Sequence, residues 1–252
     1  DLLFMYSLTS ETIVKMNQDL QKASVREVLT HASNQFDQDV AISFSGAEDV
    51  VLIDMAHQAG LSVRVFSLDT GRLHAETYEF MERVRDHYSI PIEFCCPEKE
   101  SLEKLVSQKG MYSFFKDGHQ ECCGIRKVQP LRKKLHTLKA WITGQRQDQS
   151  PGTRTEIPIM QLDSGFGSPE SILIKYNPLA NWTSSRVWNY IRNNRVPYNR
   201  LHERGFISLG CEPCTRPVLP NQHEREGRWW WEEATQKECG LHVINLDAMK
   251  KD

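Results

Sequence analysis

The chain has 252 residues, of which 39% are hydrophobic and 25% charged, and its formal net charge is -2. That content suits one large or two small domains with an ample core. A nearly balanced charge gives no electrostatic reason to expect nucleic acid or a membrane surface as a partner. Apolar runs are too short to span a bilayer and the N-terminus lacks a signal-peptide pattern, so we expect a cytoplasmic protein.

Seven cysteines are an unusual number for such a chain. Because seven is odd, intrachain disulfides cannot use them all, and in a reducing cytosol clustered cysteines more often bind metal or carry redox chemistry. Four metal ligands and one nucleophile would account for five of them. The positions are Cys95, Cys96, Cys122, Cys123, Cys211, Cys214 and Cys239.

Strand patterns alternate with helical patterns along most of the chain. Residues 11–36 and 74–88 have helical spacing of apolar residues, and strands are expected at about 39–44, 62–68, 90–94, 140–144 and 172–179. This alternation predicts an α/β fold, a mainly parallel twisted sheet with helices on both faces. Ligands of such sheets bind beyond the carboxyl ends of the strands.

The first strand runs into a small-residue turn that contains Ser43, Ser45 and Gly46, and a helix follows from about Glu48. Free backbone N–H groups and the positive end of a helix dipole at such a turn form an anion site. The turn lacks the Gly-Lys-Ser/Thr ending of a Walker A loop. An ordinary strand-to-helix turn is the alternative. A second polar loop, residues 69–71, follows Leu68 at the end of the next strand.

Two cysteine pairs have different expected roles. Cys95 and Cys96 end a strand, where adjacent side chains point to opposite faces, so they are interpreted as packing cysteines. Cys122 and Cys123 are expected at the start of a helix, where successive side chains project about 100° apart and can approach one multi-metal centre.

Cys211 and Cys214 form a Cys-x-x-Cys in a Gly/Pro loop, a spacing that lets one tight turn present two thiolates to one centre. Together with Cys122 and Cys123 they supply four thiolates. Zinc and an iron–sulfur cluster both accept four cysteine ligands, and the chemistry alone leaves the choice open.

Basic residues and one further cysteine follow. Arg146 and Arg154, in the loop after the fourth strand, can hold an oxyanion or simply face solvent. Residues 225–231 combine two arginines with three tryptophans, which fits either an arm that closes over a site or a packing patch. Cys239 lies among polar residues downstream of these cations, which could stabilise its reactive thiolate form, but the motif alone fits an inert free thiol better.

Four motifs in this order resemble the assimilatory adenylyl-sulfate (APS) reductases, within the wider family that includes the phosphoadenylyl-sulfate (PAPS) reductases. They are Ser43–Asp49, Cys122–Leu131, Gly210–Cys214 and Glu238–His242, and the resemblance extends from about residue 39 to residue 242. It implies a fold of the adenine-nucleotide alpha-hydrolase type. It also implies a [4Fe-4S] cluster bound by Cys122, Cys123, Cys211 and Cys214.

The resemblance further implies an oxidoreductase of sulfate assimilation and cysteine biosynthesis. Cys239 would attack the sulfur of APS, releasing AMP and leaving an S-sulfonated cysteine, and thioredoxin or glutaredoxin would then release sulfite. The sequence ends too soon after Cys239 for the fused redox domain of plant-type relatives, so an external reductant is expected. The loop departs from the ATP pyrophosphatase pattern at Ala47 and Val50, which suits a nucleotide without a pyrophosphate.

Particular roles follow for the candidate residues. Cys239, His242 and Lys127 are expected to be catalytic. Fixed cations would stabilise the bound anion and the leaving group. The residues expected to bind substrate are Ser43, Ser45, Gly46, Leu68, Lys127, Arg154, Arg225, Arg228 and His242. Attack by a thiolate needs no electron from the cluster, so we expect its oxidation state to stay constant in that step.

Residues 1–224 are expected to form the nucleotide-binding domain with the cluster, and residues 225–252 a flexible arm that carries the nucleophile and opens for the second thiol. A homo-oligomer is compatible with the sequence. The alternatives are a PAPS reductase, a zinc-stabilised nucleotide-binding module without turnover, and an ATP-dependent tRNA-modifying enzyme. The last would need a basic RNA-binding surface, which the charge does not support.

Overall fold

A computed structural model describes residues 9–149, 157–168, 171–232 and 241. The chain divides into two compact units, each built from separate stretches of sequence. The first unit comprises Asp1–Phe66, Leu135–Val196 and Ile244–Asp252, and the second comprises Ser67–Lys134 and Pro197–Val243. The predicted division, a domain of residues 1–224 followed by an arm of residues 225–252, stays a prediction.

One six-stranded sheet has the order β3-β2-β1-β4-β6-β5. Its strands are β1 (Val40–Ser43), β2 (Arg64–Leu68), β3 (Glu93–Cys95), β4 (Ala140–Ile142), β5 (Met160–Leu162) and β6 (Ile174–Tyr176). Strand β1 pairs in parallel with β2 and with β4, and β4 pairs in parallel with β6. Strand β5 pairs antiparallel with β6. The predicted α/β class with a mainly parallel sheet is therefore confirmed.

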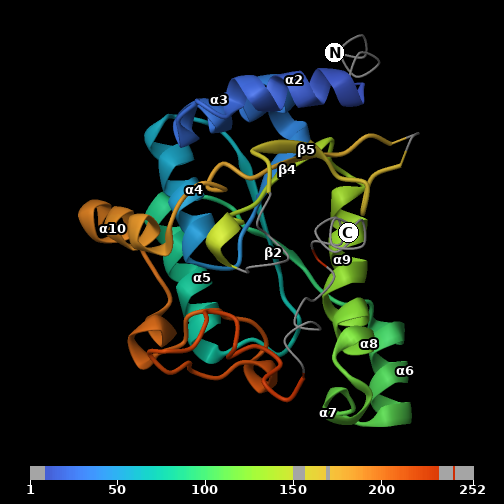
Figure 1. Cartoon of the computed structure of the whole chain (residues 1–252). Coiled ribbons are helices and arrows are strands. Elements are labelled where there is room, and N and C mark those ends of the chain that lie inside the picture. The colour runs from blue at the N-terminus through green and yellow to red at the C-terminus, as the bar shows by residue number, and fades with distance from the viewer. Residues whose placement is uncertain (1–8, 150–156, 169–170, 233–240, 242–252) are drawn as a thin grey trace. The chain divides into compact units, whose positions relative to one another are not determined.

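The first unit holds four of the longer helices and the fully buried strands β4 and β6. These helices are α2 (Ser10–Leu20), α3 (Val25–Phe36), α4 (Ala47–Gln58) and α10 (Ser184–Asn194). Helix α4 lies between α3 and α10 (Figure 1), and both pack against it. Its residues Val50–Ile53 are buried on every side, because the helix is enclosed by neighbours rather than facing water. That enclosure fixes its N-terminus at the end of β1.

The second unit carries short helices and long loops around α5 (Ala75–Tyr88). Helix α6 (Lys99–Lys109) runs beside the column formed by α8 (Gln120–Cys123), the π-helical turn η2 (Gly124–Val128) and α9 (Gln129–Leu135), as Figure 1 shows. The short α7 (Phe114–Asp117) precedes α8. The remaining short elements of the chain are η1 (Asp37–Asp39), η3 (Gln147–Gln149), η4 (Arg200–Arg204) and η5 (Glu212–Cys214).

Local sequence explains where the predicted elements differ from the observed ones. The expected lead-in helix over residues 11–36 is two helices, because Ser24 caps α3 and forms a reciprocal capping box with Glu27. Strand β5 was not predicted. The interpretation of Cys96 as a packing cysteine is wrong, because Cys96 is exposed and only Cys95 is partly buried.

Within the described ranges, the structure contains no helix with the length and hydropathy needed to cross a lipid bilayer.

Candidate functional site

Four cysteines of the second unit face one cavity. Cys122 and Cys123 end α8, whereas Cys211 immediately precedes η5 and Cys214 ends it, so two short helices far apart in the sequence present the thiols. Cys123, Cys211 and Cys214 are buried, and Cys122 packs against them at the cavity edge. All are free thiols. The sequence predicted this convergence of Cys122–Cys123 with Cys211–Cys214 on one centre.

The geometry of the four thiols bears on the kind of metal they can hold. Among the residues the structure describes, no three His, Cys, Asp or Glu side chains are arranged to hold a single ion. A zinc ion needs its four sulfurs about 2.3 Å from one point. A cluster of several iron atoms binds each thiolate at a different iron and so spaces the thiolates further apart. Four thiols that face one cavity are the ligand set that both kinds of centre use.

Cations beside the cavity favour the thiolate form of Cys211. Burial alone raises the pKa of this thiol, but Lys127, a hydrogen bond with the Thr70 hydroxyl, Arg228 and Arg126 outweigh burial, and the pKa ends below its ordinary value. The Thr70 oxygen lies 3.2 Å from the Cys211 sulfur. By contrast, burial and the neighbouring Cys211 raise the pKa of Cys214 to about 12. Metal binding would overcome this cost, because ligation requires deprotonated thiols.

Beside the same cavity lie five buried N–H donors that have no acceptor among the described residues. They are Arg72 Nη1, Arg126 Nε, Arg228 Nε, Trp229 Nε1 and Trp231 Nε1. Leaving a buried donor unpaired costs about 1–3 kcal/mol, so a concentration of such atoms indicates an absent acceptor. Thiolates and inorganic sulfides are acceptors, and an anionic iron–sulfur cluster would supply them. These residues therefore fit a cluster of that kind.

Trp229 organises the predicted cations of this unit. Its ring is fully buried, and three cationic groups lie over it: the Arg228 guanidinium at 4.4 Å from the ring centre, Arg225 at 5.9 Å and the Lys127 ammonium at 6.0 Å. Cation–π attraction of this kind strengthens where water is excluded. Gly210 lets the Arg228 guanidinium approach the backbone closely, since a Cβ there would displace that group.

A buried hydrogen-bonded pair ties the segment after Trp229 to the cysteine helix. The Glu232 carboxylate accepts from the His119 backbone N–H at 2.9 Å and from its ring Nδ1 at 2.6 Å. The His119 ring also stacks on Trp229, with ring centres 4.2 Å apart. His119 immediately precedes α8, so Glu232 is bonded to the residue at the start of the helix that carries Cys122 and Cys123.

In the first unit, Asp49 closes the turn that was predicted as an anion site. Its carboxylate accepts from the backbone N–H groups of Ser45 at 2.8 Å and Gly46 at 2.9 Å, and from Gly144 at 3.0 Å. Two of the turn's N–H groups therefore bind the chain's own carboxylate. A Cβ at Gly144 would lie 2.5 Å from Asp49 Oδ1, so only glycine allows this approach.

Burial of Asp49 and the neighbouring Glu48 charge raise its pKa to about 6, although hydrogen bonds from Ser45 and Gly46 act in the opposite direction. The carboxyl group therefore titrates near neutral pH at the end of β1 and β4.

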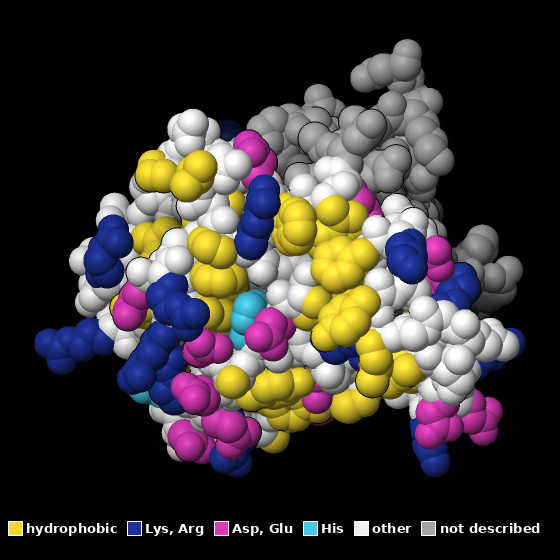
Figure 2. All heavy atoms as spheres, turned by 90° about the horizontal axis from the view of Figure 1, so that it is seen from below, with side chains coloured by type: hydrophobic (Ala, Val, Ile, Leu, Met, Phe, Trp, Pro, Cys, Tyr) yellow, Lys and Arg dark blue, Asp and Glu magenta, His cyan; other side chains and the backbone are white. Residues whose placement is uncertain are grey.

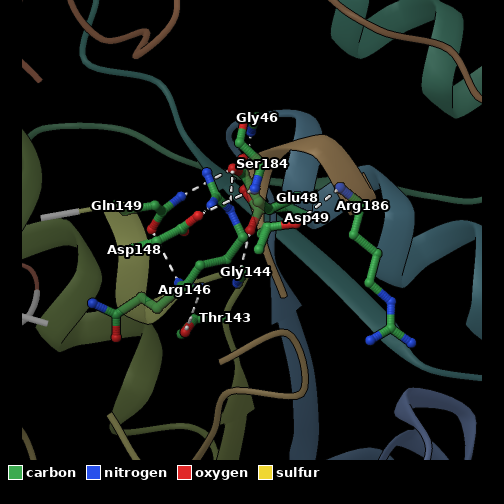
Figure 3. A network of polar contacts seen from close by, with 12 residues as sticks. Gly46, Glu48, Asp49, Thr143, Gly144, Arg146, Asp148, Gln149, Ser184 and Arg186 are labelled. Atoms are coloured by element: carbon green, nitrogen blue, oxygen red, sulfur yellow. Dashed lines mark hydrogen bonds and ion pairs between the residues drawn. The ribbon is translucent and has the colours of Figure 1, made fainter. Parts of the chain in front are cut away.

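Arg146 does not face solvent as a free cation. It is buried and pairs with Glu48 at 3.0 Å and with Asp148, and Gln149 also donates to Glu48 (Figure 3). Asp148 accepts from the backbone of Ser184 at the start of α10. The network links the end of β4 to the first turns of two helices, and its carboxylates balance the Arg146 charge before any ligand binds.

The structure thus groups the candidate residues in two sets. Lys127, Arg225 and Arg228 lie with the four cysteines in the second unit, which also contains Leu68. Ser43, Ser45 and Gly46 lie at the end of β1 in the first. The remaining candidates lie outside the described residues; they are Arg154, Cys239 and His242.

Sequence reasoning missed several residues of the site. Thr70 and Arg126 received no role, although Thr70 lies in a loop expected at the ligand edge and Arg126 adjoins Lys127. The buried Arg126 also donates to the Thr70 carbonyl at 2.6 Å. The pairing of His119 with Glu232 had no local signal, because it joins residues 113 positions apart.

Fold and site together define an α/β protein with a four-thiol, cation-rich centre. A family model described as the phosphoadenosine phosphosulfate reductase domain matches residues 39–217. A Pseudomonas aeruginosa protein named adenosine 5'-phosphosulfate reductase is 60% identical over 227 residues, which are 90% of this chain and 85% of that protein. The chain belongs to the APS/PAPS reductase family.

Two further comparisons agree with this membership. An Arabidopsis thaliana chloroplastic 5'-adenylylsulfate reductase is 54% identical over 249 residues, 96% of this chain and 53% of that protein. The crystal structure of a Candida auris PAPS reductase has a TM-score of 0.69 at 28% identity and covers 84% of this chain and 98% of its own. A Candida glabrata FMN adenylyltransferase, 15% identical with a TM-score of 0.54 and coverage of 96% and 82%, shares the fold alone.

The raised pKa of Asp49 predicts a particular pH dependence of stability. A carboxyl group with a pKa of about 6 in the folded chain and about 3.8 when unfolded stabilises the fold most below pH 4. This contribution, on the order of 2–3 kcal/mol, is lost as the pH rises to about 6. The difference in unfolding free energy between wild type and Asp49→Asn should therefore widen as the pH falls from 7 to 4.

Denaturant titrations at several pH values measure this difference. Asp19→Asn, on the exposed part of α2, controls for removal of a carboxylate. A difference that stays constant or narrows toward pH 4 would show that Asp49 is ionised throughout.

Removing the Glu232 carboxylate should loosen the His119 backbone. In Glu232→Ala the His119 N–H loses its acceptor but stays buried. The free energy of local opening should therefore fall by about 1–3 kcal/mol, and amide exchange at His119 should become roughly 5- to 150-fold faster. Glu226→Ala is the matched control, because Glu226 accepts a backbone N–H, that of His223 at 3.0 Å, on an exposed turn. Equal exchange at His119 in all three proteins would contradict the role given to Glu232.

Proposed function

We propose that the chain reduces APS to sulfite and AMP in assimilatory sulfate reduction, with Cys239 as nucleophile and a thioredoxin-like protein as reductant. The observation that supports this most is the set of four thiols and buried cations in the second unit, together with 60% identity to a protein named adenosine 5'-phosphosulfate reductase. The cytoplasm is the proposed compartment, since clustered cysteines that bind metal are typical of a reducing compartment.

Cys122, Cys123, Cys211 and Cys214 would hold a [4Fe-4S] cluster. When bound, the cluster supplies a fixed group of negative charge and sulfur acceptors beside Lys127 and Arg228. The unpaired donors of Arg126, Arg228 and Trp229 would bond to those acceptors. The protein itself would then hold Lys127 and Arg228 in buried, fixed positions, where the cluster neutralises their charge only in part.

In the first step the Cys239 thiolate attacks the sulfur of APS. A sulfur–sulfur bond forms, the bond from sulfur to the phosphate oxygen breaks, and its electron pair leaves with AMP. The sulfonate oxygens and the departing phosphate are both negative, so cations are needed at both. Lys127, Arg154, Arg225, Arg228 and His242 are proposed for this work, and Ser43, Ser45, Gly46 and Leu68 for binding the nucleotide.

In the second step a thiolate of the reductant attacks the Cys239 sulfur. The bond to the sulfonate breaks and sulfite leaves with the electron pair. The second thiol of the reductant then displaces Cys239 from the mixed disulfide, so that a dithiol becomes a disulfide while the substrate sulfur is reduced by two electrons. The arm of residues 225–252 is proposed to open between the two steps.

Intact mass after mixing the reduced protein with APS, without any reductant protein, tests the nucleophile. The wild type should gain the mass of one sulfonate, and Cys239→Ala should gain none. Cys96→Ala, which removes an exposed cysteine, should behave as wild type. An adduct in the Cys239 variant would exclude Cys239 as the nucleophile.

The nucleotide released in the same reaction identifies the substrate. AMP is expected with APS, whereas a faster adduct with PAPS, releasing adenosine 3',5'-bisphosphate, would assign the chain to the PAPS-specific branch.

A further inference from the structure

The second unit exposes a cluster of large apolar side chains, which we name the aromatic patch: Met111, Tyr112, Phe115 and Trp230. Their exposed fractions range from 41% to 62%. The rings adjoin one another, since the centre of Phe115 lies 6.2 Å from that of Tyr112 and 6.3 Å from that of Trp230. Figure 2, seen from the side on which α7 lies in Figure 1, shows hydrophobic side chains gathered on this face.

A buried layer connects the patch with the cysteine cavity. Phe115 lies against Phe114 at 4.7 Å and Trp231 at 4.5 Å between ring centres, and both of these rings pack against the cysteine cluster. The guanidinium of Arg72, a residue that lines the cavity, lies over Tyr112 at 5.4 Å. The patch is thus the outer surface of the structure that surrounds the four thiols, and its side chains are held by rings beneath them.

Exposed rings of this kind are costly to leave in water. Contiguous apolar patches mark interaction sites, and Tyr, Trp, Phe and Met are the residue types enriched at protein interfaces. Arg216, whose guanidinium lies 5.0 Å from the Trp230 ring centre, adds a polar border of the sort found at interface rims. Four side chains make a small surface, and a small surface suits a transient complex rather than a permanent one.

The reaction itself requires a transient protein partner near this surface. Sulfite release needs a thiol of the reductant in contact with the Cys239 sulfur. Trp230 and Cys239 are nine residues apart in the sequence, so the covalent chain allows at most about 30 Å between them. Of the exposed large hydrophobic side chains that the structure describes, Trp230 is the nearest to Cys239 along the chain.

We propose that the aromatic patch is the docking surface for the thioredoxin-like dithiol protein that releases sulfite from Cys239. This rests on the proposed function and names the surface that the reductant contacts. Apolar docking would place a neutral, ring-rich face of the reductant beside the arm while its thiolate attacks the Cys239 sulfur. The electron pair then leaves with sulfite, and the reductant's second thiol completes the disulfide as above.

The test separates the two half-reactions in Trp230→Ser and Met111→Ser, neither of which removes a residue that lines the cysteine cavity. Trp230→Phe retains an aromatic ring and serves as the conservative variant. Val14→Ser is the matched control, because Val14 and Met111 are each 57% exposed and Val14 lies on α2 of the first unit. The probes are APS, a bacterial thioredoxin and dithiothreitol.

In every variant the rate of adduct formation with APS should stay within about twofold of wild type. The rate at which dithiothreitol cleaves the adduct should also stay within about twofold. Release by thioredoxin at low concentration should slow about tenfold in Trp230→Ser and less in Met111→Ser, since truncating an interface aromatic removes much of the binding energy. Trp230→Phe should recover most of the rate, and Val14→Ser should match wild type.

Several results would overturn the docking surface. Unchanged release by thioredoxin in both serine variants would place the reductant elsewhere. Slower adduct formation with APS would mean that the patch holds the chain's own arm, and a changed oligomeric state would mean that a second copy covers it. A wild type that forms no adduct with APS or PAPS would instead contradict the proposed function, and the docking proposal would fall with it.

Discussion

Positive charge buried beside four thiols is the constraint on which the second unit depends. Arg126, Lys127 and Arg228 are each almost completely buried, and several of the donors around them have no acceptor among the described residues. Buried charge is tolerated only where it is compensated. An anionic centre bound by the thiols would compensate it, and the same centre would relieve the raised pKa of Cys214.

That charge balance also connects structure with catalysis. The cations that stabilise thiolates in the cavity lie over Trp229, and three residues later Glu232 bonds to His119 at the start of the helix that carries two of the cysteines. The first unit makes a separate contribution, since Asp49 and the Arg146 network hold the ends of β1 and β4 in one arrangement.

The fold and the set of four cysteines could be predicted because both depend on patterns within short stretches of the sequence. Alternating strands and helices give the parallel sheet, and the spacing of Cys122–Cys123 and Cys211–Cys214 gives the shared centre. Contacts between distant residues have no such pattern. Two such contacts are the hydrogen bonds of His119 with Glu232 and of Thr70 with Cys211, and each forms only when distant segments pack together. The sequence left Arg146 either as an oxyanion ligand or as a solvated side chain and did not predict its ion pair with Glu48, because that carboxylate lies 98 residues earlier.

Metal content tests the central claim most directly, namely that the four thiols and the buried cations hold an anionic iron–sulfur centre. The protein, prepared without oxygen, should show broad visible absorption and contain about four iron and four acid-labile sulfide per chain. Cys123→Ser should lose both. One zinc per chain without sulfide, in a protein that forms the sulfonate adduct, would contradict the account.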